Sequence, residues 1–448
     1  MSPTTTDALK RRASAPPLLQ WVWVGALVGV VCGAASAIFL ELLDFATKTR
    51  VASELWVWCL PFAGAAIGFI YDHWGKPIRG GNNLVIDTVH DDRPQIPLRM
   101  APMVLVGTVL THLFGGSAGR EGTAVQMGAS LADAVAHFFR LTPHVRRQML
   151  AAGIAGGFGS VFGTPVAGAV FGLEVVCIGR LEYDALLPAL IAAVVGDLTT
   201  RALGVTHTAY PVPAALPLDA MVLAKWLVFG AGIALATVLF VELTHGLKAR
   251  LERWVPRLPV RMFLGGCLVV LMWRLVGSGD YLGLGVPTIV AAFTEPDIPA
   301  YAFLAKIVFT AVTLSAGFLG GEVTPLFFVG ATLGNILGQA LGLPLELAAG
   351  VGLAALFGAA ANTPLALSIM AVELLGGNAF PHVVIVVTAA YVMTGHRGIY
   401  PAQRLLRGKW GGPPLQPAVA LRDVSQRPPP GEDPPSPQRA KVDTSQDG

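Results

Sequence analysis

Two glycine-rich stretches decide the fold of this chain: Gly115-Gly-Ser-Ala-Gly-Arg-Glu-Gly-Thr123 and Gly317-Phe-Leu-Gly-Gly-Glu-Val-Thr-Pro325. Each interrupts strongly apolar sequence, and each carries a glutamate followed two residues later by a threonine. A bilayer tolerates broken backbone and carboxylates only where protein buries them or where they line a polar pathway. The two stretches therefore predict an ion pathway made of two related halves.

The composition indicates a polytopic membrane protein. Of the 448 residues, 54% are hydrophobic and 13% are charged, whereas soluble domains carry about 25% charged residues. The net charge of +3 is too small and too scattered for binding to nucleic acid. The four cysteines stand alone in apolar sequence and lack metal-ligand spacing. We therefore expect a lipid bilayer as the environment, with no metal, no cofactor and no nucleic-acid partner.

The apolar segments have two lengths. Several reach the ~20 residues of a simple membrane span, but many have only about 13 to 17 residues and end at Gly or Pro. Such short pieces are typical of the half-helices and re-entrant segments of transporters. The first run, over residues 18–45, is too long for the apolar core of a signal peptide and is predicted to be the first membrane helix.

The chain divides into three parts on the sequence. Residues 1–17 form a cytoplasmic N-terminal segment, and 18–405 form a transmembrane ion-transport domain with repeats at about 18–204 and 218–405. The proline-rich, polar residues 406–448 are predicted to be a disordered cytoplasmic tail. Lysine and arginine gather in a few loops and flank both ends, which predicts that both termini face the cytoplasm.

An internal repeat supports the two halves. The stretch from Phe158 to Glu174 aligns with the stretch from Phe357 to Glu373, and Phe, Gly, Thr, Pro, Ala and Glu coincide at a constant offset of 199 residues. The glutamates of the two glycine-rich stretches are offset by 201 residues. Two matches at nearly one offset predict a repeat, and an odd number of spans in each half would invert it, with the site at the midplane.

The glycine-rich breaks have the chemistry of anion sites. A helix that opens after a glycine turn presents free N–H groups at its positive dipole end. Two such helices are expected after Gly119 and Gly321, and a third candidate follows Gly80-Gly-Asn-Asn83, where the amides of Asn82 and Asn83 add donors.

The positions of Glu121 and Glu322 beside an expected anion site require a physical explanation. A carboxylate in a low-dielectric region is costly unless it takes up a proton. A glutamate that enters the anion site when ionised and leaves it when protonated would exchange anions for protons. The structural alternatives are that Glu121 pairs with Arg120, that Glu322 caps a helix and that Thr324 is only a helix-start hydroxyl.

Three further residues have structural alternatives. The structural interpretation of Tyr400 is an aromatic anchor at the membrane–water interface. Glu174 and Glu373 lie late in their helices, and we expect packing or interface roles for both.

At this point the motifs resemble the CLC family of anion channels and antiporters. Gly119-Arg-Glu-Gly122 resembles the GREGP motif of that family, with Thr123 in place of proline, and Gly321-Glu-Val-Thr-Pro325 takes the place of its GxFxP motif. Gly163-Thr-Pro-Val-Ala-Gly168 resembles its NAPLAG stretch. The resemblance covers about residues 18 to 405. It implies an all-α inverted repeat of tilted and re-entrant helices, in a homodimer with one pore in each subunit.

The departures from the family pattern resemble its fluoride-exporting branch, the CLC-F fluoride/proton antiporters. Asn82 stands at the serine position of the chloride-coordinating GSGIP loop, and Glu322 and Thr324 are additions to GxFxP. Val175 stands where chloride antiporters have an intracellular proton-transfer glutamate.

The resemblance also implies roles for single residues. Glu121 matches the gating and proton-coupling glutamate, and Glu322 matches the second glutamate of the fluoride branch. Tyr400 matches the central pore tyrosine. The remaining residues implied in anion binding are Asn82, Asn83, Gly119, Arg120, Gly122, Val323 and Thr324.

The function expected from these matches is export of fluoride in exchange for protons across a bacterial inner membrane. The first alternative is a chloride channel or chloride/proton antiporter of the same fold, which would share Glu121. An intramembrane enzyme would need a nucleophile–base pair or metal ligands such as His-Glu-x-x-His, and the sequence has neither. A purely structural membrane protein would not need paired glycine–glutamate breaks.

Overall fold

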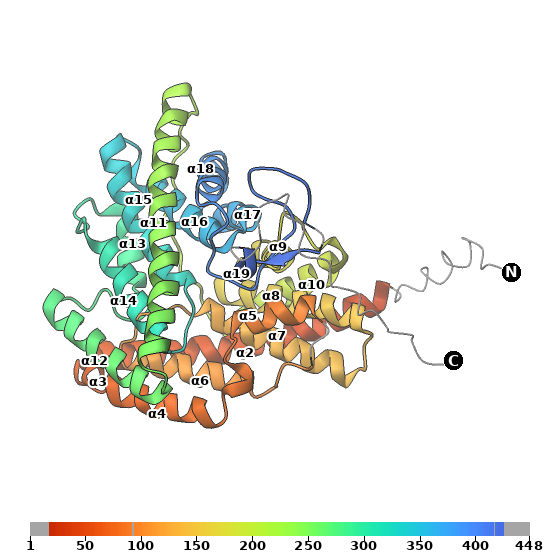
Figure 1. Ribbon diagram of the computed structural model, residues 1–448. Helices are drawn as coiled ribbons and strands as arrows, with labels where there is room; N and C mark the ends of the chain where they lie inside the picture. Colours follow the sequence, from red (N-terminus) through yellow and green to blue (C-terminus); the bar gives the residue numbers. More distant parts are fainter. Residues whose placement is uncertain (1–17, 92–93, 416, 425–448) are drawn as a thin grey trace, which may run out of the picture.

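The computed structural model describes residues 18–91, 94–415 and 417–424, which are mostly helical (Figure 1). The helices of the N-terminal half are α2 (Leu18–Ala52), α3 (Leu55–Trp58), α4 (Leu60–His73), α5 (Asn82–His90), α6 (Met100–Leu113), α7 (Glu121–Phe138), α8 (Pro143–Phe162), α9 (Pro165–Glu174) and α10 (Leu186–Ala202). Those of the C-terminal half are α11 (Ala220–Trp254), α12 (Leu258–Val276), α13 (Val286–Thr294), α14 (Ala302–Ala316), α15 (Val323–Leu341), α16 (Leu345–Ala361), α17 (Pro364–Leu375), α18 (Phe380–Met393) and α19 (Leu421–Val424).

Short elements complete the described chain. They are the 3-10 turns η1 (Lys76–Ile78), η2 (Tyr183–Ala185) and η3 (Gly377–Ala379) and the strands β1 (Cys177–Ile178), β2 (Arg404–Leu405) and β3 (Val419–Ala420). The strands form one small sheet in the order β1-β2-β3, with β1 and β2 parallel and β2 and β3 antiparallel. The predicted all-α class is confirmed.

The two halves repeat the same packing. Helix α7 packs on α8 as α15 packs on α16, and α8 packs on α9 and α10 as α16 packs on α17 and α18. Figure 1 shows the N-terminal half, in red to yellow, largely below and to the right of the green-to-blue C-terminal half. Matching sequence therefore gives matching structure.

The local sequence explains why the matched helices end and begin together. Gly163, with φ of 73°, caps the C-terminal end of α8, and Asn362, with φ of 58°, caps that of α16. Both are left-handed caps, which glycine and asparagine adopt most readily. Each cap is followed by threonine and then by Pro165 or Pro364 at the first position of the next helix, where proline is favoured because its missing N–H costs nothing.

Glu174 and Glu373 join the two halves in a reciprocal way. The carboxylate of Glu174, late in α9, accepts hydrogen bonds from the amides of Leu365 (3.1 Å) and Ala366 (2.8 Å) at the start of α17. The carboxylate of Glu373, late in α17, accepts them from Val166 (3.0 Å) and Ala167 (2.8 Å) at the start of α9. Each glutamate thus satisfies amides that a helix start leaves free, which is the packing role expected from the sequence.

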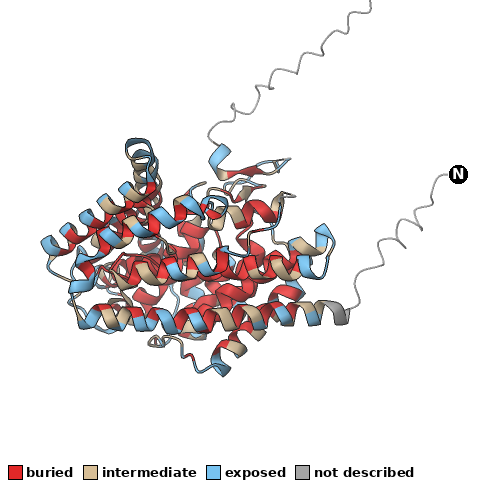
Figure 2. Cartoon of the chain, turned by 90° about the horizontal axis from the view of Figure 1, so that it is seen from below, coloured by how far each residue is buried: buried red, intermediate tan, exposed pale blue. Residues whose placement is uncertain are grey.

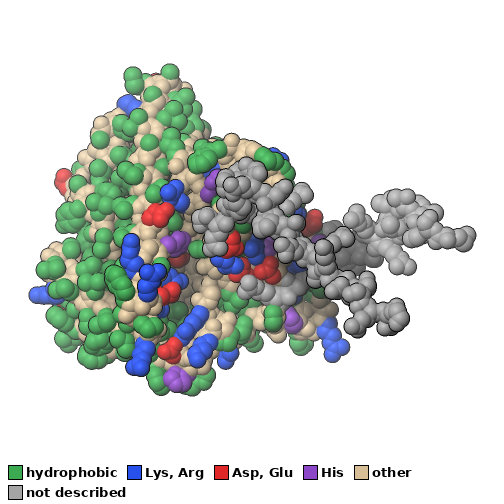
Figure 3. All heavy atoms as spheres, viewed as in Figure 1, with side chains coloured by type: hydrophobic (Ala, Val, Ile, Leu, Met, Phe, Trp, Pro, Cys, Tyr) green, Lys and Arg blue, Asp and Glu red, His purple; other side chains and the backbone are tan. Residues whose placement is uncertain are grey.

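Several helices are long and apolar enough to cross a membrane. They are Trp21–Ala52, Tyr183–Ala202, Ala220–Trp254, Leu258–Val276 and Val323–Leu341. Others are much shorter, such as α9 with 10 residues and α17 with 12. Figure 2 shows the outer helices with buried inner faces and exposed outer faces, and Figure 3 shows many hydrophobic side chains on the face in view. The prediction of a multi-pass membrane protein with many short pieces agrees with this arrangement.

The C-terminal boundary requires a correction. The sequence predicted a disordered tail from residue 406, but residues 406–415 and 417–424 include β3 and α19 and pack on α5. The physical reason is the pairing of β3 with β2, together with ion pairs to α5 that composition does not reveal. Residues 1–17 and 425–448 lie outside the described residues.

Candidate functional site

The two glycine-rich breaks lie against each other. The amide of Gly119 donates to the carbonyl of Gly321 (2.6 Å), and the amide of Gly321 donates to the carbonyl of Gly119 (2.8 Å). Helix α7 begins two residues after the first glycine, and α15 begins two residues after the second. The bridge therefore holds two helix N-termini side by side, as two converging anion sites require.

Glu121 lies across this junction. Its carboxylate accepts hydrogen bonds from the Thr324 hydroxyl (2.6 Å to Oε1, 2.8 Å to Oε2) and from the Thr324 amide (3.1 Å). The Arg120 amide donates a further bond of 3.1 Å. With 1% of its surface exposed, the carboxylate fills the position at the α15 N-terminus where an anion would find the same donors.

The structural alternatives for these residues are only partly present. The Arg120 guanidinium approaches Glu121 at 3.5 Å, so an ion pair exists beside the shorter bonds to Thr324. Thr324 is more than a helix-start hydroxyl, because its side chain contacts a carboxylate of the other repeat. Tyr400 is 4% exposed and lines a cavity, which does not fit an interfacial anchor.

A cavity of about 620 Å³ lies next to the junction. Four of the predicted residues line it: Asn82, Asn83, Glu322 and Tyr400. Glu121 does not line it, and neither do Gly119, Arg120, Gly122, Val323 and Thr324. The predicted residues thus divide into a cavity lining and a closed junction.

The loop before α5 brings amides to the cavity. Gly81 has φ of 55°, a conformation that glycine allows, and α5 begins directly after it at Asn82. The Asn82 side-chain oxygen is buried without a hydrogen-bond partner in the described structure. The Asn83 side-chain oxygen accepts a bond of 3.0 Å from the Ala402 amide, next to Tyr400. The start of α5 therefore lies close to the segment that carries Tyr400, and both line the cavity.

The predicted glycines serve the backbone more than the anion. The Gly119 amide is occupied by Gly321, so it is not a free donor. At Gly122, an added Cβ would lie 2.9 Å from the Asn82 Nδ2 atom and 3.1 Å from the Gly321 Cα atom. Glycine there lets three segments meet. Val323 is buried as the first residue of α15.

Sequence reasoning missed part of the cavity lining. Thr108 and Thr123 share a hydrogen bond of 2.7 Å between their hydroxyls, and both line the cavity together with Gln126. Gln126 lies one helical turn after Gly122, a spacing that could have revealed it. Three cationic residues of the loops and helix ends also line the cavity: Arg79, Lys248 and Arg261. From the sequence, the clustered lysine and arginine residues predicted only the membrane topology.

The cationic residues of the cavity differ in their partners. Arg79 is paired with Asp72, and Arg261 lies 3.7 Å from Glu252. Lys248 makes no ion pair with any described residue and is exposed. On the face seen in Figure 3, charged side chains gather near the centre. Among the described residues, no group of three or more His, Cys, Asp or Glu side chains could hold a metal ion.

Comparisons with known proteins identify the family. The family model described as "Voltage gated chloride channel" matches residues 63–395. The chain is 48% identical over 417 residues to the chloride/fluoride channel protein of Pseudomonas syringae pv. tomato, with 92% of each chain covered. It is 25% identical over 384 residues to the H(+)/Cl(-) exchange transporter ClcA of Yersinia pseudotuberculosis, which covers 78% of this chain and 79% of that protein.

A solved structure agrees in fold. The crystal structure of a CLC-type fluoride/proton antiporter superimposes with a TM-score of 0.84 at 38% identity, covering 87% of this chain and 98% of that chain. The expected CLC-type inverted repeat is thereby confirmed, and the matched proteins are channels and transporters. This chain belongs to the voltage gated chloride channel family, that is, to the CLC channels and transporters.

Proposed function

We propose that this protein is a fluoride/proton antiporter that exports fluoride in exchange for protons. The observation that carries the proposal is the contact of the Glu121 carboxylate with the hydroxyl and amide of Thr324. A helix N-terminus binds anions and carboxylates with the same donors. Fluoride and ionised Glu121 therefore compete for one site, and protonation of Glu121 frees it for fluoride.

Glu322 gives the exchange its second carboxyl group. It stands at the start of α15, two residues before Thr324, and it lines the cavity. A proton that arrives through the cavity reaches Glu322 before the closed junction. Glu322 is also close enough to the anion route to offer a protonated carboxyl as a donor to fluoride, which is small and holds its hydration shell tightly. The glutamate that is added to the GxFxP motif thus provides a carboxyl group for proton transfer or for binding fluoride.

Within this proposal, the remaining site residues are anion donors or shape the route. Asn82, Asn83 and Tyr400 face the cavity as amide and hydroxyl donors. Thr324 and Val323 supply the start of α15, and Gly119, Arg120 and Gly122 shape the junction. The printed names of two matched proteins, a chloride/fluoride channel protein and a fluoride/proton antiporter, support fluoride as the anion.

The second candidate function is chloride/proton exchange. The match to ClcA favours it, because that protein is named as an H(+)/Cl(-) exchange transporter. The Asn82 amide at the start of α5 and the extra carboxyl of Glu322 favour fluoride instead.

The proposal includes the setting of the transporter. By the family resemblance it is a homodimer with one pore in each subunit, and it lies in a bacterial inner membrane. The distribution of lysine and arginine supports two cytoplasmic termini. The cavity, with Arg79, Lys248 and Arg261 in its lining, would then open to the cytoplasm, where fluoride is collected.

The test is ion efflux from liposomes that contain the purified protein, with fluoride and chloride compared and pH recorded together. Fluoride efflux with uphill proton movement and little chloride flux is the expected result. Chloride efflux as fast as fluoride efflux would exclude the fluoride assignment. Fluoride efflux without proton movement would leave a channel in which Glu121 is only a gate.

A further inference from the structure

Helix α5 is short and is held in place by contacts with other segments of the chain. Helix α5 has nine residues, and Asn82 and Asn83 are its first two. Such a short helix is marginal alone, so tertiary contacts must fix its position. Whatever fixes α5 therefore fixes the amides that face the cavity.

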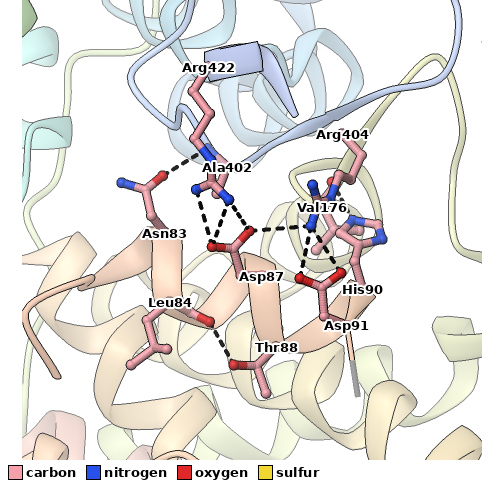
Figure 4. Close-up of polar contacts among 10 residues, drawn as sticks. All are labelled: Asn83, Leu84, Asp87, Thr88, His90, Asp91, Val176, Ala402, Arg404 and Arg422. Atoms are coloured by element: carbon pink, nitrogen blue, oxygen red, sulfur yellow. Dashed lines mark hydrogen bonds and ion pairs between the residues drawn. The ribbon is translucent and has the colours of Figure 1, made fainter. Parts of the chain in front are cut away.

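Two arginines of the C-terminal strap, here residues 401–415 and 417–424, bind the carboxylates of α5 and the residue after it (Figure 4). Arg422 donates to both oxygens of Asp87 at 3.0 to 3.1 Å. Arg404 donates to Asp87 at 3.4 Å and to both oxygens of Asp91 at 3.1 Å. Asp87 is 4% exposed, so the bonds to Asp87 are partly shielded from water and are stronger than surface pairs.

The same strap contacts the N-terminus of α5. The Ala402 amide donates to the Asn83 side chain at 3.0 Å, and Tyr400 lies two residues earlier in the chain. The strap folds back on itself, because the Leu421 amide donates to the Gln403 carbonyl (2.9 Å) and the Arg422 amide to the Pro401 carbonyl (3.0 Å). The strap therefore contacts both ends of α5, and it directly follows Tyr400 in the chain.

The strap is itself anchored where the two repeats meet. Gln403 is fully buried, and its side-chain amide donates to the carbonyl of Val175, after α9, and to the carbonyl of Ala361, at the end of α16 (2.8 Å each). Its oxygen accepts a bond of 3.0 Å from Asn362. The strap is thus a fixed frame, and Arg404 and Arg422 connect α5 to it.

We propose that Arg422, with Arg404, is a positioning residue that sets the place of the Asn82 and Asn83 amides relative to Tyr400, which lines the same cavity. The inference rests on the proposed function for the identity of the anion. Neither arginine lines the cavity, so each acts through α5. Loss of the Arg422 contact loosens the loop and weakens anion binding there, while the junction of Glu121 and Thr324 keeps its contacts.

The experiment measures anion efflux from liposomes with the full-length protein, as a function of anion concentration. Arg422→Gln is expected to raise the half-saturating fluoride concentration about tenfold, less than the ~100-fold that a 1 Å displacement can cost at a reacting centre. Preference for fluoride over chloride should fall with it. Arg422→Lys keeps the charge but loses the forked geometry. Its half-saturating fluoride concentration is expected to lie between those of the unmodified protein and Arg422→Gln. The matched control is Arg407→Gln, an exposed arginine of the same strap without an ion pair in the described structure.

Two results would overturn the inference. One is an Arg422→Gln protein whose half-saturating concentration and selectivity equal those of Arg407→Gln. The other is a loss of thermal stability and maximal rate with the half-saturating concentration unchanged, since that is what a merely structural contact gives. Where Arg422→Gln does not fold, Arg422→Lys decides by the same criteria. If the unmodified protein carries chloride and not fluoride, the proposed function fails, and the half-saturating chloride concentration still decides the role of the strap.

Discussion

The carboxylate of Glu121 and the hydroxyl of Thr324 lie 2.6 Å apart although 203 residues separate them in the chain. The contact joins the N-termini of α7 and α15, which belong to different repeats. Because the donors of Thr324 are those that an anion needs, we expect an anion and the Glu121 carboxylate to compete for them.

Replacement of Glu121 by glutamine should uncouple anion movement from proton movement. The carboxamide has nearly the same size and can still accept a bond from Thr324, but it cannot take up and release a proton. We expect proton flux to fall by about 100-fold or more, the scale of a lost acid–base group. Simultaneous fluoride-electrode and pH recordings on liposomes would measure it. Proton flux that stays coupled to fluoride would remove Glu121 from the mechanism.

Thr324→Val should weaken fluoride binding at the start of α15. The change keeps the side-chain shape and removes the hydroxyl that now contacts Glu121. Hydrogen bonds to charged groups contribute about 1.5–3 kcal/mol, so the apparent affinity should fall about tenfold or more. Thr332→Val is the matched control, because that buried hydroxyl of the same helix donates to backbone carbonyls of its own helix, those of Phe328 and Val329. Equal affinities of the two variants would contradict the assignment of Thr324.

Glu322→Gln should slow coupled transport while leaving the junction of the two breaks intact. Glu322 lines the cavity, and the hydrogen bonds between Glu121 and Thr324 do not involve its side chain. Both proton and fluoride fluxes are expected to fall together, by about tenfold or more. Glu252→Gln, which removes another carboxylate of the same cavity, should have little effect. Proton-coupled fluoride transport that is unchanged in Glu322→Gln would refute a role for this second glutamate.

The sequence could predict the features that are local. Glycine before an apolar run, with a polar residue at the start, predicted helix N-termini near Asn82, Glu121 and Val323, and all three helices begin there. The matched Gly-Thr-Pro and Asn-Thr-Pro turns belong to the predicted repeat, and α9 and α17 begin at their prolines. These signals depend on backbone preferences of a few adjacent residues, which is why they could be read without the structure.

The sequence could not predict contacts between the halves. The Gly119–Gly321 bridge depends on how two groups of helices dock, and no local preference encodes it. The proline-rich composition after residue 405 predicted disorder, yet Arg422 is held by Asp87, 335 residues away. Thr108 lies in ordinary helical sequence, and only the shape of the cavity marks it.

The reciprocal caps give a prediction on stability. Glu174 is 7% exposed and accepts two backbone amides with two oxygens. In Glu174→Gln one oxygen becomes an amide nitrogen, which leaves a buried N–H without an acceptor at a cost of about 1–3 kcal/mol. Thermal unfolding of the purified protein in detergent should show a lower midpoint. Glu373→Gln, at the equivalent but exposed cap, should lower it less, because an exposed side chain has room to rotate its amide nitrogen away from the donors. A larger effect at Glu373 would contradict this account.

Lys248 provides a prediction that separates long-range attraction from direct binding. It lines the cavity that holds Glu322 and is exposed, so it should raise the local fluoride concentration without contacting the closed junction. Lys248→Gln is expected to slow fluoride entry about threefold at low ionic strength. The difference should vanish at about 1 M salt, where the screening length is only ~3 Å. Arg250→Gln is the control, since this exposed arginine of the same helix does not line the cavity. A loss of rate that persists at high salt would show instead that Lys248 binds the anion directly.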